Sequence, residues 1–534
     1  MRGSSLDCRP WALILSCALL LGGCGPGGDS DGAPFRFVEA DITGIHDAIL
    51  TGERTCRSIV EGYLARIAAY DQPGGLNAIT SVNPRALARA DELDEALGAG
   101  EEPGPLFCAP LIVKDNFDTA DMATTGGSEA LADSHPPDDA FMVRKLREAG
   151  AIVLAKSNMA EWAFSPMDTV SSTAGTTANA YDLGRVPAGS SGGTASAVAA
   201  SFGAAGLGSD TGNSIRGPSS HLALAGIRST LGLTSRDGII PLLLNRDVGG
   251  PMARTVEDMT RLFDVVAGYD PADPITEEGR GKRPDSYLEF LDTDGLRGAR
   301  IGVLRILIEA ETADPEIRDL MEAALVDLRR LGAELVDPFE IERFAQLTGA
   351  VEFCNTFRFD LANYLRSLGD GAPIQDIQQA VDAGQYHEIS KEDMEWAVSI
   401  GADVRPEDQD PPCVGVQGDP RRKALFDAVM TAMDGAQVDA FVYPTWSNPP
   451  APIDRAREEY RGDNSQLIAP HTGMPAVTVP MGFTSGGTLP AGLQFLGRAY
   501  SEGELIRFAY AYEQGTLHRR PPASFPELAP ADGE

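Results

Sequence analysis

GSSGGTASAVAASFGAAGLGSDTGNSIR, residues 189–216, places a serine-bearing glycine cluster at each end of a run of small residues. Glycine is used where the backbone takes positive φ or closely approaches another group, so both clusters are expected to be functional loops. The small residues of 194–202 predict a short buried helix, and the apolar run 204–208 predicts a strand leading into the second loop. A flexible linker would not contain an apolar segment of helical length. We therefore interpret the stretch as two loops of a catalytic site joined by a helix and a strand.

Neither serine cluster contains a histidine that could act as the base. A serine hydroxyl is a weak nucleophile at neutral pH, and the usual base that activates it is histidine. PLIVKDN, residues 110–116, offers Lys114 at the end of an apolar strand instead. Burial disfavours the charged ammonium and lowers the pKa of a lysine, so a neutral amine becomes available to accept a proton.

Together these motifs resemble those of the amidase signature family. That family carries a GSSGG loop, an alanine-rich run and a G-[ST]-[DE]-x-G-G-S-I-R-x-P loop, which resembles GSDTGNSIRGP at residues 208–218. Further similar segments follow in family order, from LARIAAY at 64–70 to GLQFLG at 492–497. The resemblance implies an α/β fold, a single large domain with a central mixed twisted sheet covered by helices on both faces.

The resemblance also implies a serine–serine–lysine relay. Ser214 is the expected nucleophile, Ser190 passes its proton on, and Lys114 is the base, in a variant of the catalytic-triad logic. A cis peptide bond is implied before Ser190. An oxyanion hole is implied as well, formed by the backbone N–H groups of Thr211, Gly212, Asn213 and Ser214.

Asn213 departs from the family pattern, which has glycine immediately before the nucleophile. Asparagine keeps the backbone donor and tolerates positive φ better than most residues, while its side chain is expected to narrow the pocket or add a hydrogen bond. Around it, Ser191, Asp210 and Arg216 are expected to support the loops through hydrogen bonds rather than to contact substrate.

Residues 1–33 have the pattern of an export signal and a tether. Arg2 and Arg9 precede an apolar run, residues 11–21, that is too short to span a bilayer as a helix. LGGC at 21–24 resembles a bacterial lipobox, which implies a signal peptide over 1–23, lipid on Cys24 and a flexible tether over 24–33. We therefore expect a protein anchored through its lipid in the cell envelope, at the periplasmic face of the outer membrane. An ordinary secretory signal with a chance cysteine is the alternative.

The length behind that tether allows one oversized domain or two or three smaller ones. The family resemblance implies one, over residues 34–527, with a C-terminal tail at 528–534. The net charge of −34 argues against nucleic-acid binding, which needs basic clusters. No cysteine spacing suggests zinc, and the family chemistry implies neither a metal nor an organic cofactor. The sequence carries no signal for an oligomeric state.

Four cysteines remain beyond the signal peptide and lipobox: Cys56, Cys108, Cys354 and Cys413. An oxidising compartment permits disulfides among them. Three pairings are possible, and buried free thiols fit the sequence equally well.

Several other side chains are interpreted as structural. Lys156 ends the next predicted strand, and His221 is interpreted as a packed histidine rather than a pocket group. The region up to about residue 412 is rich in helical pattern and is expected to shape substrate access. Aromatic residues are interpreted as core rather than as pocket lining: Trp162, Phe164, Phe353, Phe357, Phe359 and Tyr364.

The sequence thus predicts a serine amidohydrolase that cleaves a small-molecule or peptide amide through an acyl-enzyme. Three alternatives stay open. Ser191 also satisfies G-x-S-x-G at 189–193, so an esterase using Ser191 and His471 is conceivable. The chain is also compatible with a tRNA-dependent amidotransferase subunit, which the export signal disfavours, and with an inactive lipoprotein that binds amides or cell-wall peptides.

Overall fold

The two serine clusters flank a helix and a strand, as the sequence predicts. Helix α5 is Gly192–Ala199 and strand β6 is Ala205–Asp210. The computed structural model describes residues 35–72 and 74–529, and the fold belongs to the unit that begins at Arg36. The predicted signal peptide 1–23, the tether 24–33 with Cys24, and tail residues 530–534 lie outside the described residues.

Strand β6 lies inside a mixed sheet of 11 strands in the order β1-β3-β2-β6-β8-β7-β12-β13-β11-β9-β10. Its other strands are β1 Ile79–Val82, β2 Pro110–Lys114, β3 Ile152–Ser157, β7 Ala225–Arg228, β8 Val248–Ala253, β9 Arg300–Val303, β10 Glu334–Val336, β11 Ala440–Pro444, β12 Ala476–Thr484 and β13 Leu489–Gly497. A second sheet pairs β4 Val170–Ser171 with β5 Gly175–Thr176. The mixed sheet confirms the predicted α/β class.

Parallel pairing brings Lys114 beside the second serine cluster. Strand β2 runs parallel to β3 and to β6, and Val113 lies opposite Leu207. The β2–β3 connection contains helix α4, Phe141–Glu148. Because parallel strands end at the same edge of a sheet, Lys114 and the loop after β6 meet where α/β sheets place their ligands.

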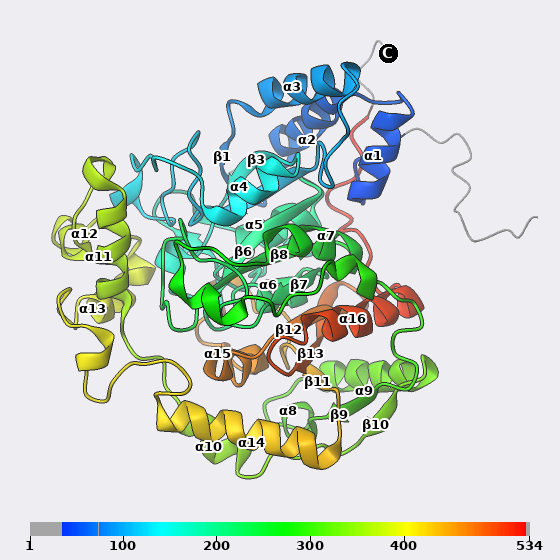
Figure 1. Ribbon diagram of the computed structural model, residues 1–534, viewed down its shortest axis with the longest axis vertical. Helices are drawn as coiled ribbons and strands as arrows, with labels where there is room; N and C mark the ends of the chain where they lie inside the picture. The colour runs from blue at the N-terminus through cyan, green and yellow to red at the C-terminus, as the bar shows by residue number, and fades with distance from the viewer. Residues whose placement is uncertain (1–34, 73, 530–534) are drawn as a thin grey trace, which may run out of the picture. The chain divides into compact units, whose positions relative to one another are not determined.

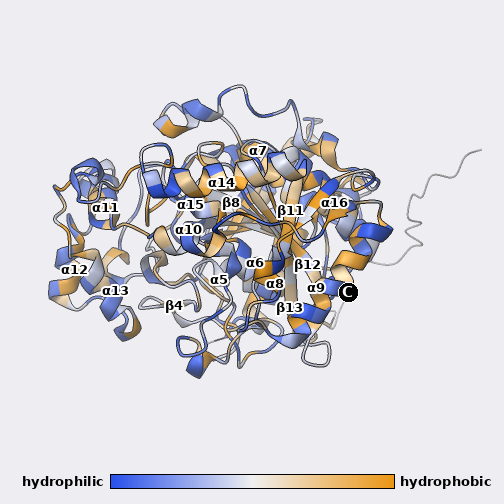
Figure 2. Cartoon of the chain, turned by 90° about the horizontal axis from the view of Figure 1, so that it is seen from below, coloured by the Kyte–Doolittle hydropathy of each residue, from blue (hydrophilic) through white to orange (hydrophobic). Residues whose placement is uncertain are grey.

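Helices cover both faces of the large sheet, and Figure 2 shows the apolar strands enclosed by helices with polar outer surfaces. They are α1 Ile42–Leu50, α2 Cys56–Tyr70, α3 Ala86–Gly98, α6 Arg216–His221, α7 Val256–Val266, α8 Arg305–Ile308, α9 Pro315–Arg330, α14 Pro420–Ala436, α15 Ala469–Thr472 and α16 Glu502–Thr516. Side-chain caps fix two of the starts, because Thr255 accepts the N–H of Asp258 and Asp314 accepts that of Glu316.

A group of short helices lies to one side of the sheet (Figure 1). It contains α11 Phe357–Ser367, α12 Ile377–Ala383 and α13 Lys391–Ala397, and it follows α10, Phe344–Ala350. A disulfide between Cys354 and Cys413 closes this segment at its base, and we call residues 354–413 the helical lobe. The second disulfide joins Cys56 to Cys108. The structure therefore selects one of the three pairings that the sequence allowed.

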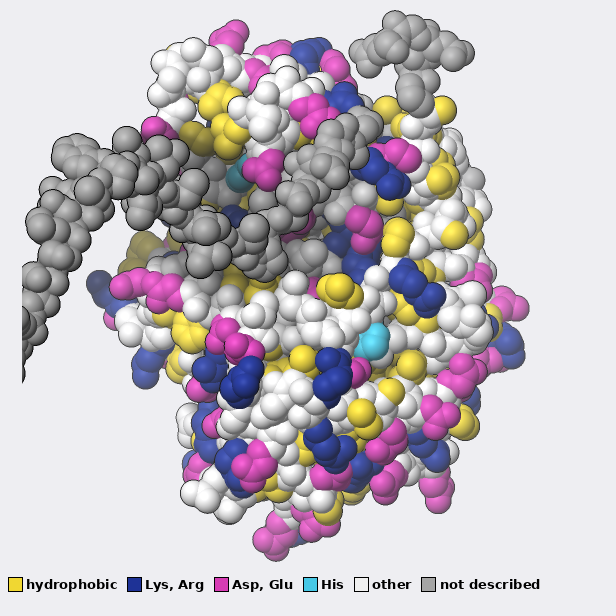
Figure 3. Space-filling view, turned by 90° about the vertical axis from the view of Figure 1, so that its right-hand side faces the viewer, with side chains coloured by type: hydrophobic (Ala, Val, Ile, Leu, Met, Phe, Trp, Pro, Cys, Tyr) yellow, Lys and Arg dark blue, Asp and Glu magenta, His cyan; other side chains and the backbone are white. Residues whose placement is uncertain are grey.

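Charges of both signs are distributed over the surface. Figure 3 shows one face, on which basic and acidic side chains of the described residues are interspersed. No helix among the described residues is long and apolar enough to cross a membrane.

Candidate active site

Lys114 and Ser190 are in direct contact at the end of β2. Lys114 is fully buried, and its Nζ donates hydrogen bonds to Ser190 Oγ at 2.7 Å and to Ser209 Oγ at 2.9 Å. Asn116 Nδ2 donates to the same Ser209 hydroxyl at 3.0 Å. Burial lowers the pKa of Lys114 to about 7, against the opposing attraction of Asp210 and Asp247. A large fraction of this lysine is therefore neutral near pH 7 and able to accept a proton.

Ser190 follows a cis peptide bond with Gly189, as the family resemblance implied. Glycine is required at 189, because an added Cβ would lie 2.2 Å from the carbonyl oxygen of Asp168 and 2.4 Å from that of Ser165. The Gly189 N–H donates to the carbonyl of Pro166 at 3.0 Å. The loop holding Ser190 is thus pressed against the turn at 165–168.

Ser214 lies in the wall of a pocket. Its hydroxyl donates to Asn213 Oδ1 at 3.5 Å, which is a weak hydrogen bond. Within the described residues, no hydrogen bond joins the hydroxyls of Ser190 and Ser214. The structure therefore brings together two members of the predicted relay and leaves the third facing the pocket.

The backbone after β6 presents a row of free N–H groups. Within the part of the chain that the structure describes, the N–H groups of Thr211, Gly212, Asn213 and Ser214 donate to no protein acceptor. The next two N–H groups, of Ile215 and Arg216, donate to Asp210 Oδ2 at 3.1 and 3.4 Å. Four successive free donors beside a serine can stabilise a developing oxyanion.

Asp210 holds this loop through hydrogen bonds and buried ion pairs. It is fully buried and pairs with Arg216 Nε at 3.1 Å and with Arg228 Nη1 at 2.8 Å. These two guanidinium groups overcome the effect of burial and hold the pKa of Asp210 well below its usual range. Ser191 is equally buried, and its hydroxyl donates to the Ser209 carbonyl at 3.2 Å. The geometry places all three expected supporting residues in internal contacts.

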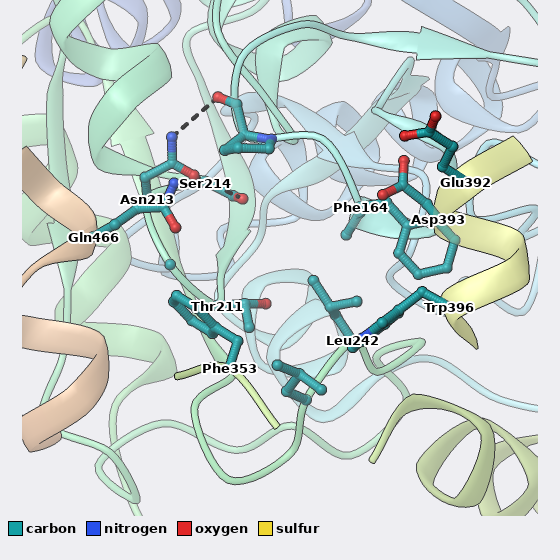
Figure 4. A pocket seen from close by; sticks show the side chains of 14 residues that line it. Phe164, Thr211, Asn213, Ser214, Leu242, Phe353, Glu392, Asp393, Trp396 and Gln466 are labelled. Atoms are coloured by element: carbon teal, nitrogen blue, oxygen red, sulfur yellow. Dashed lines mark hydrogen bonds between the residues drawn. The ribbon is translucent and has the colours of Figure 1, made fainter. Parts of the chain in front are cut away.

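A pocket of about 400 Å³ opens at Ser214 (Figure 4). Five of its large apolar side chains are Phe164, Leu242, Leu243, Phe353 and Trp396. Among the described residues that line it, only Glu392 and Asp393 are charged, and Figure 4 shows them across the pocket from Ser214. The core interpretation was wrong for Phe353, which lines this pocket, and it is confirmed for Trp162, Phe357 and Tyr364, which pack in a buried cluster. Phe164 does both, since it lines the pocket and packs against that cluster.

Sequence reasoning missed the pocket residues of α13, because a helix with mixed polarity carries no signal for what it faces. Ser209 and Asn116 were also missed, although both lie within two residues of a predicted site residue.

The structural interpretations of Lys156 and His221 fit their surroundings. Lys156 Nζ donates to the Phe117 carbonyl at 2.7 Å and forms an ion pair with Asp115. His221 is buried against Trp446, with ring centroids 4.6 Å apart, and burial lowers its pKa to about 3. Lys156 is held by polar contacts and His221 by packing, and neither lines the pocket at Ser214.

Fold and site together define an enzyme of the amidase signature type. The family model described as Amidase matches residues 58–506, and the chain belongs to this family, whose hydrolases cleave amide C–N bonds.

Two relatives with different activities resemble the chain over almost its whole length. A glutamyl-tRNA(Gln) amidotransferase subunit of Thermosynechococcus vestitus is 35% identical over 497 residues, which are 90% of this chain and 99% of the relative. The native peptide amidase of Stenotrophomonas maltophilia superposes with a TM-score of 0.80 at 36% identity, covering 92% of this chain and 99% of the amidase. A structure of the peptide amidase with the competitive inhibitor chymostatin gives a TM-score of 0.79.

Proposed function

We propose that this protein is a serine amidohydrolase that cleaves carboxylic amides through an acyl-enzyme on Ser214. The observation that carries the proposal is the 2.7 Å contact between Lys114 Nζ and Ser190 Oγ, with the pKa of that lysine lowered to about 7 by burial. When Lys114 is neutral it can act as a base, and Ser190, which is hydrogen-bonded to it, can pass a proton to it. The similarity to peptide amidase supports hydrolysis as the reaction.

The first half-reaction forms the acyl-enzyme. Ser214 Oγ bonds to the amide carbonyl carbon, its proton passes to Ser190, and the Ser190 proton passes to Lys114. The negative charge on the carbonyl oxygen is held by the free N–H groups of 211–214. The C–N bond then breaks, and the proton returns from Lys114 through Ser190 to the leaving nitrogen.

The second half-reaction uses water by the same route. Water loses a proton through Ser190 to Lys114 and bonds to the acyl carbon, after which the bond to Ser214 Oγ breaks and Ser214 regains its proton. The products are a carboxylic acid and an amine or ammonia. In this scheme the Ser214 hydroxyl turns from Asn213 toward Ser190 when substrate is bound.

The pocket supports small-molecule or peptide amides as substrates. Its aromatic and aliphatic walls suit an apolar acyl or side-chain group next to the scissile bond. The complex of peptide amidase with chymostatin supports the same substrate class.

We also propose that the chain is exported and anchored in the cell envelope by lipid on Cys24. The support is the lipobox-like LGGC at 21–24, together with the two disulfides, which suit an oxidising compartment. Labelling of the expressed full chain with a radioactive fatty acid tests this. Incorporation that is lost in Cys24→Ala supports it, and equal incorporation in both chains contradicts it.

A role within a tRNA-dependent amidotransferase is the second candidate, favoured by the 35% identity to the Thermosynechococcus vestitus protein. Assay of the purified chain distinguishes the two candidates. An amidohydrolase turns over amides alone, whereas an amidotransferase subunit would co-purify with cytoplasmic partners.

The esterase alternative requires a hydrogen bond between Ser191 and a histidine such as His471. Ser191 Oγ donates to a backbone carbonyl, while His471 lies beside Phe353 with ring centroids 4.8 Å apart. Within the described residues, no hydrogen bond connects Ser191 with His471.

Labelling with a serine-directed fluorophosphonate probe, read by intact mass, tests the proposed mechanism. We expect one adduct on Ser214 that is absent in Ser214→Ala and slow to form in Ser190→Ala and Lys114→Ala. Ser191→Ala is the matched control, because it removes a hydroxyl from the same loop. A folded wild-type protein without an adduct, or with one on Ser191, contradicts the proposal, and the former outcome would support an amide-binding lipoprotein instead.

A further inference from the structure

The side chain of Asn213 connects the two serine loops through one shared carbonyl. Asn213 is 1% exposed, and its Nδ2 donates to the carbonyl oxygen of Pro166 at 3.0 Å (Figure 4). The same oxygen accepts the N–H of Gly189 at 3.0 Å. Since Gly189 precedes Ser190 and Asn213 precedes Ser214, Pro166 holds the residue before each serine.

The hydrogen bond to Pro166 also fixes which way the amide of Asn213 faces. A carbonyl oxygen accepts but cannot donate, so the NH₂ group of Asn213 must point at Pro166 and the Oδ1 atom must point away from it. That Oδ1 atom accepts the hydroxyl of Ser214 at 3.5 Å. One buried amide therefore contacts both the carbonyl that holds the Ser190 loop and, through a weak hydrogen bond, the hydroxyl of Ser214.

We infer that the Asn213 side chain is a positioning residue for the relay, acting through Pro166 on the spacing of Ser190 and Ser214. This inference rests on the proposed function. The contact matters because a relay fails when donor and acceptor hydroxyls are misplaced, and a shift of about 1 Å can cost about 10²-fold in rate. Ser190 is held by Lys114 and the Gly189 contact, and Asp210 holds the backbone just after Ser214. The Asn213 amide is the contact that ties the residue before Ser214 to the Ser190 loop.

Two substitutions separate positioning from simple structure. Asn213→Ala removes the tie to Pro166 and keeps the backbone N–H of the oxyanion hole. We expect kcat to fall about 10- to 100-fold with a smaller change in KM, because Asn213 lines the pocket but the aromatic and aliphatic side chains of its walls are unchanged. Asn448→Ala is the matched control, since its amide is also buried and donates to a carbonyl, that of Thr312, at 3.0 Å. It is expected to keep kcat.

Asn213→Asp adds a pH-dependent readout at the same position, because only the protonated carboxyl can donate to Pro166. The ionised carboxylate cannot donate to Pro166, and it places a negative charge beside the oxyanion site, so activity is expected below that of Asn213→Ala. A protonated carboxyl can donate to Pro166 again. Because burial raises the pKa of a carboxyl group, the activity ratio of Asn213→Asp to Asn213→Ala is expected to rise as the pH falls.

The outcomes are distinguishable from those that test the proposed function. If the wild-type protein takes up no probe and hydrolyses no amide, the proposed function fails. If the wild type is active and Asn213→Ala keeps its kcat, or the ratio between the two variants is constant with pH, the inference about Asn213 is overturned. Thermal melting of each variant shows whether it is folded at the assay temperature.

Discussion

Phe164 and Trp396 meet edge to face in the wall of the pocket, with ring centroids 6.2 Å apart and an interplanar angle of 88°. Phe164 belongs to the segment that contacts the Ser190 loop, and Trp396 belongs to α13 of the helical lobe. Phe164 also packs on Phe357 of α11, with centroids 4.9 Å apart. The lobe therefore builds one side of the pocket, and its placement sets the shape that a substrate meets.

The disulfide at the base of the lobe is predicted to control substrate affinity. Cys354→Ser combined with Cys413→Ser should raise KM several-fold and change kcat less. The reason is that α13 loses a covalent attachment, whereas the contacts that hold Ser190 and Ser214 are unchanged. Cys56→Ser with Cys108→Ser is the control. The two disulfides close loops of similar length, with separations of 59 and 52 residues, so each is expected to contribute about 4 kcal/mol to stability. Equal KM values in the two double variants would show that packing alone holds the lobe.

The pH dependence of hydrolysis should follow the titration of Lys114. Its pKa of about 7 lies below the ordinary value of 10.5, and the reactive form is the neutral one. We expect kcat/KM to rise with pH through about 7 and then to level off. Lys114→Arg should lose this activity by about 10²–10⁴-fold, because the guanidinium stays protonated. A flat profile between about pH 5 and 9 would contradict a lysine base.

Asp210→Asn is predicted to destabilise the protein strongly. The change leaves two buried arginines, Arg216 and Arg228, without their carboxylate, and breaking such a buried group costs about 3–5 kcal/mol. Urea unfolding measures the loss. Asp294→Asn removes an exposed partner of Arg297, and because water screens this pair the urea midpoint should stay almost unchanged. Similar losses in both variants would mean that the Asp210 ion pairs contribute nothing beyond surface charge.

Glu392 and Asp393 predict a preference for substrates that carry a positive charge away from the scissile bond. Among the described residues they alone bring charge to the wall of the pocket, and Arg457 approaches Asp393 only to 3.9 Å. Paired amides that differ in one cationic group, assayed at low and high salt, measure the preference. It should shrink in Glu392→Gln with Asp393→Asn and with added salt. Glu395→Gln, on the same helix but outside the pocket lining, should keep it.

Local sequence was sufficient for much of the fold. The apolar run before Lys114 and the small residues between the serine clusters predicted a strand and a helix from preferences that act within a few residues. Because neighbouring atoms set these conformations, the structure confirms both elements. The order of the sheet was not accessible in this way, because β6 pairs with β8 and β2 across long separations.

The candidate catalytic groups could be identified from the sequence alone: two serines in glycine loops, a lysine after an apolar strand and no histidine beside them. Tertiary contacts were needed for the pairing of the four cysteines, the use of Phe164 and Phe353 as pocket wall, and the bond from Asn213 to the Pro166 carbonyl. The physical reason is distance along the chain. Glycine, capping and burial preferences act locally, whereas Asn213 and Pro166, 47 residues apart, meet only after the sheet has packed.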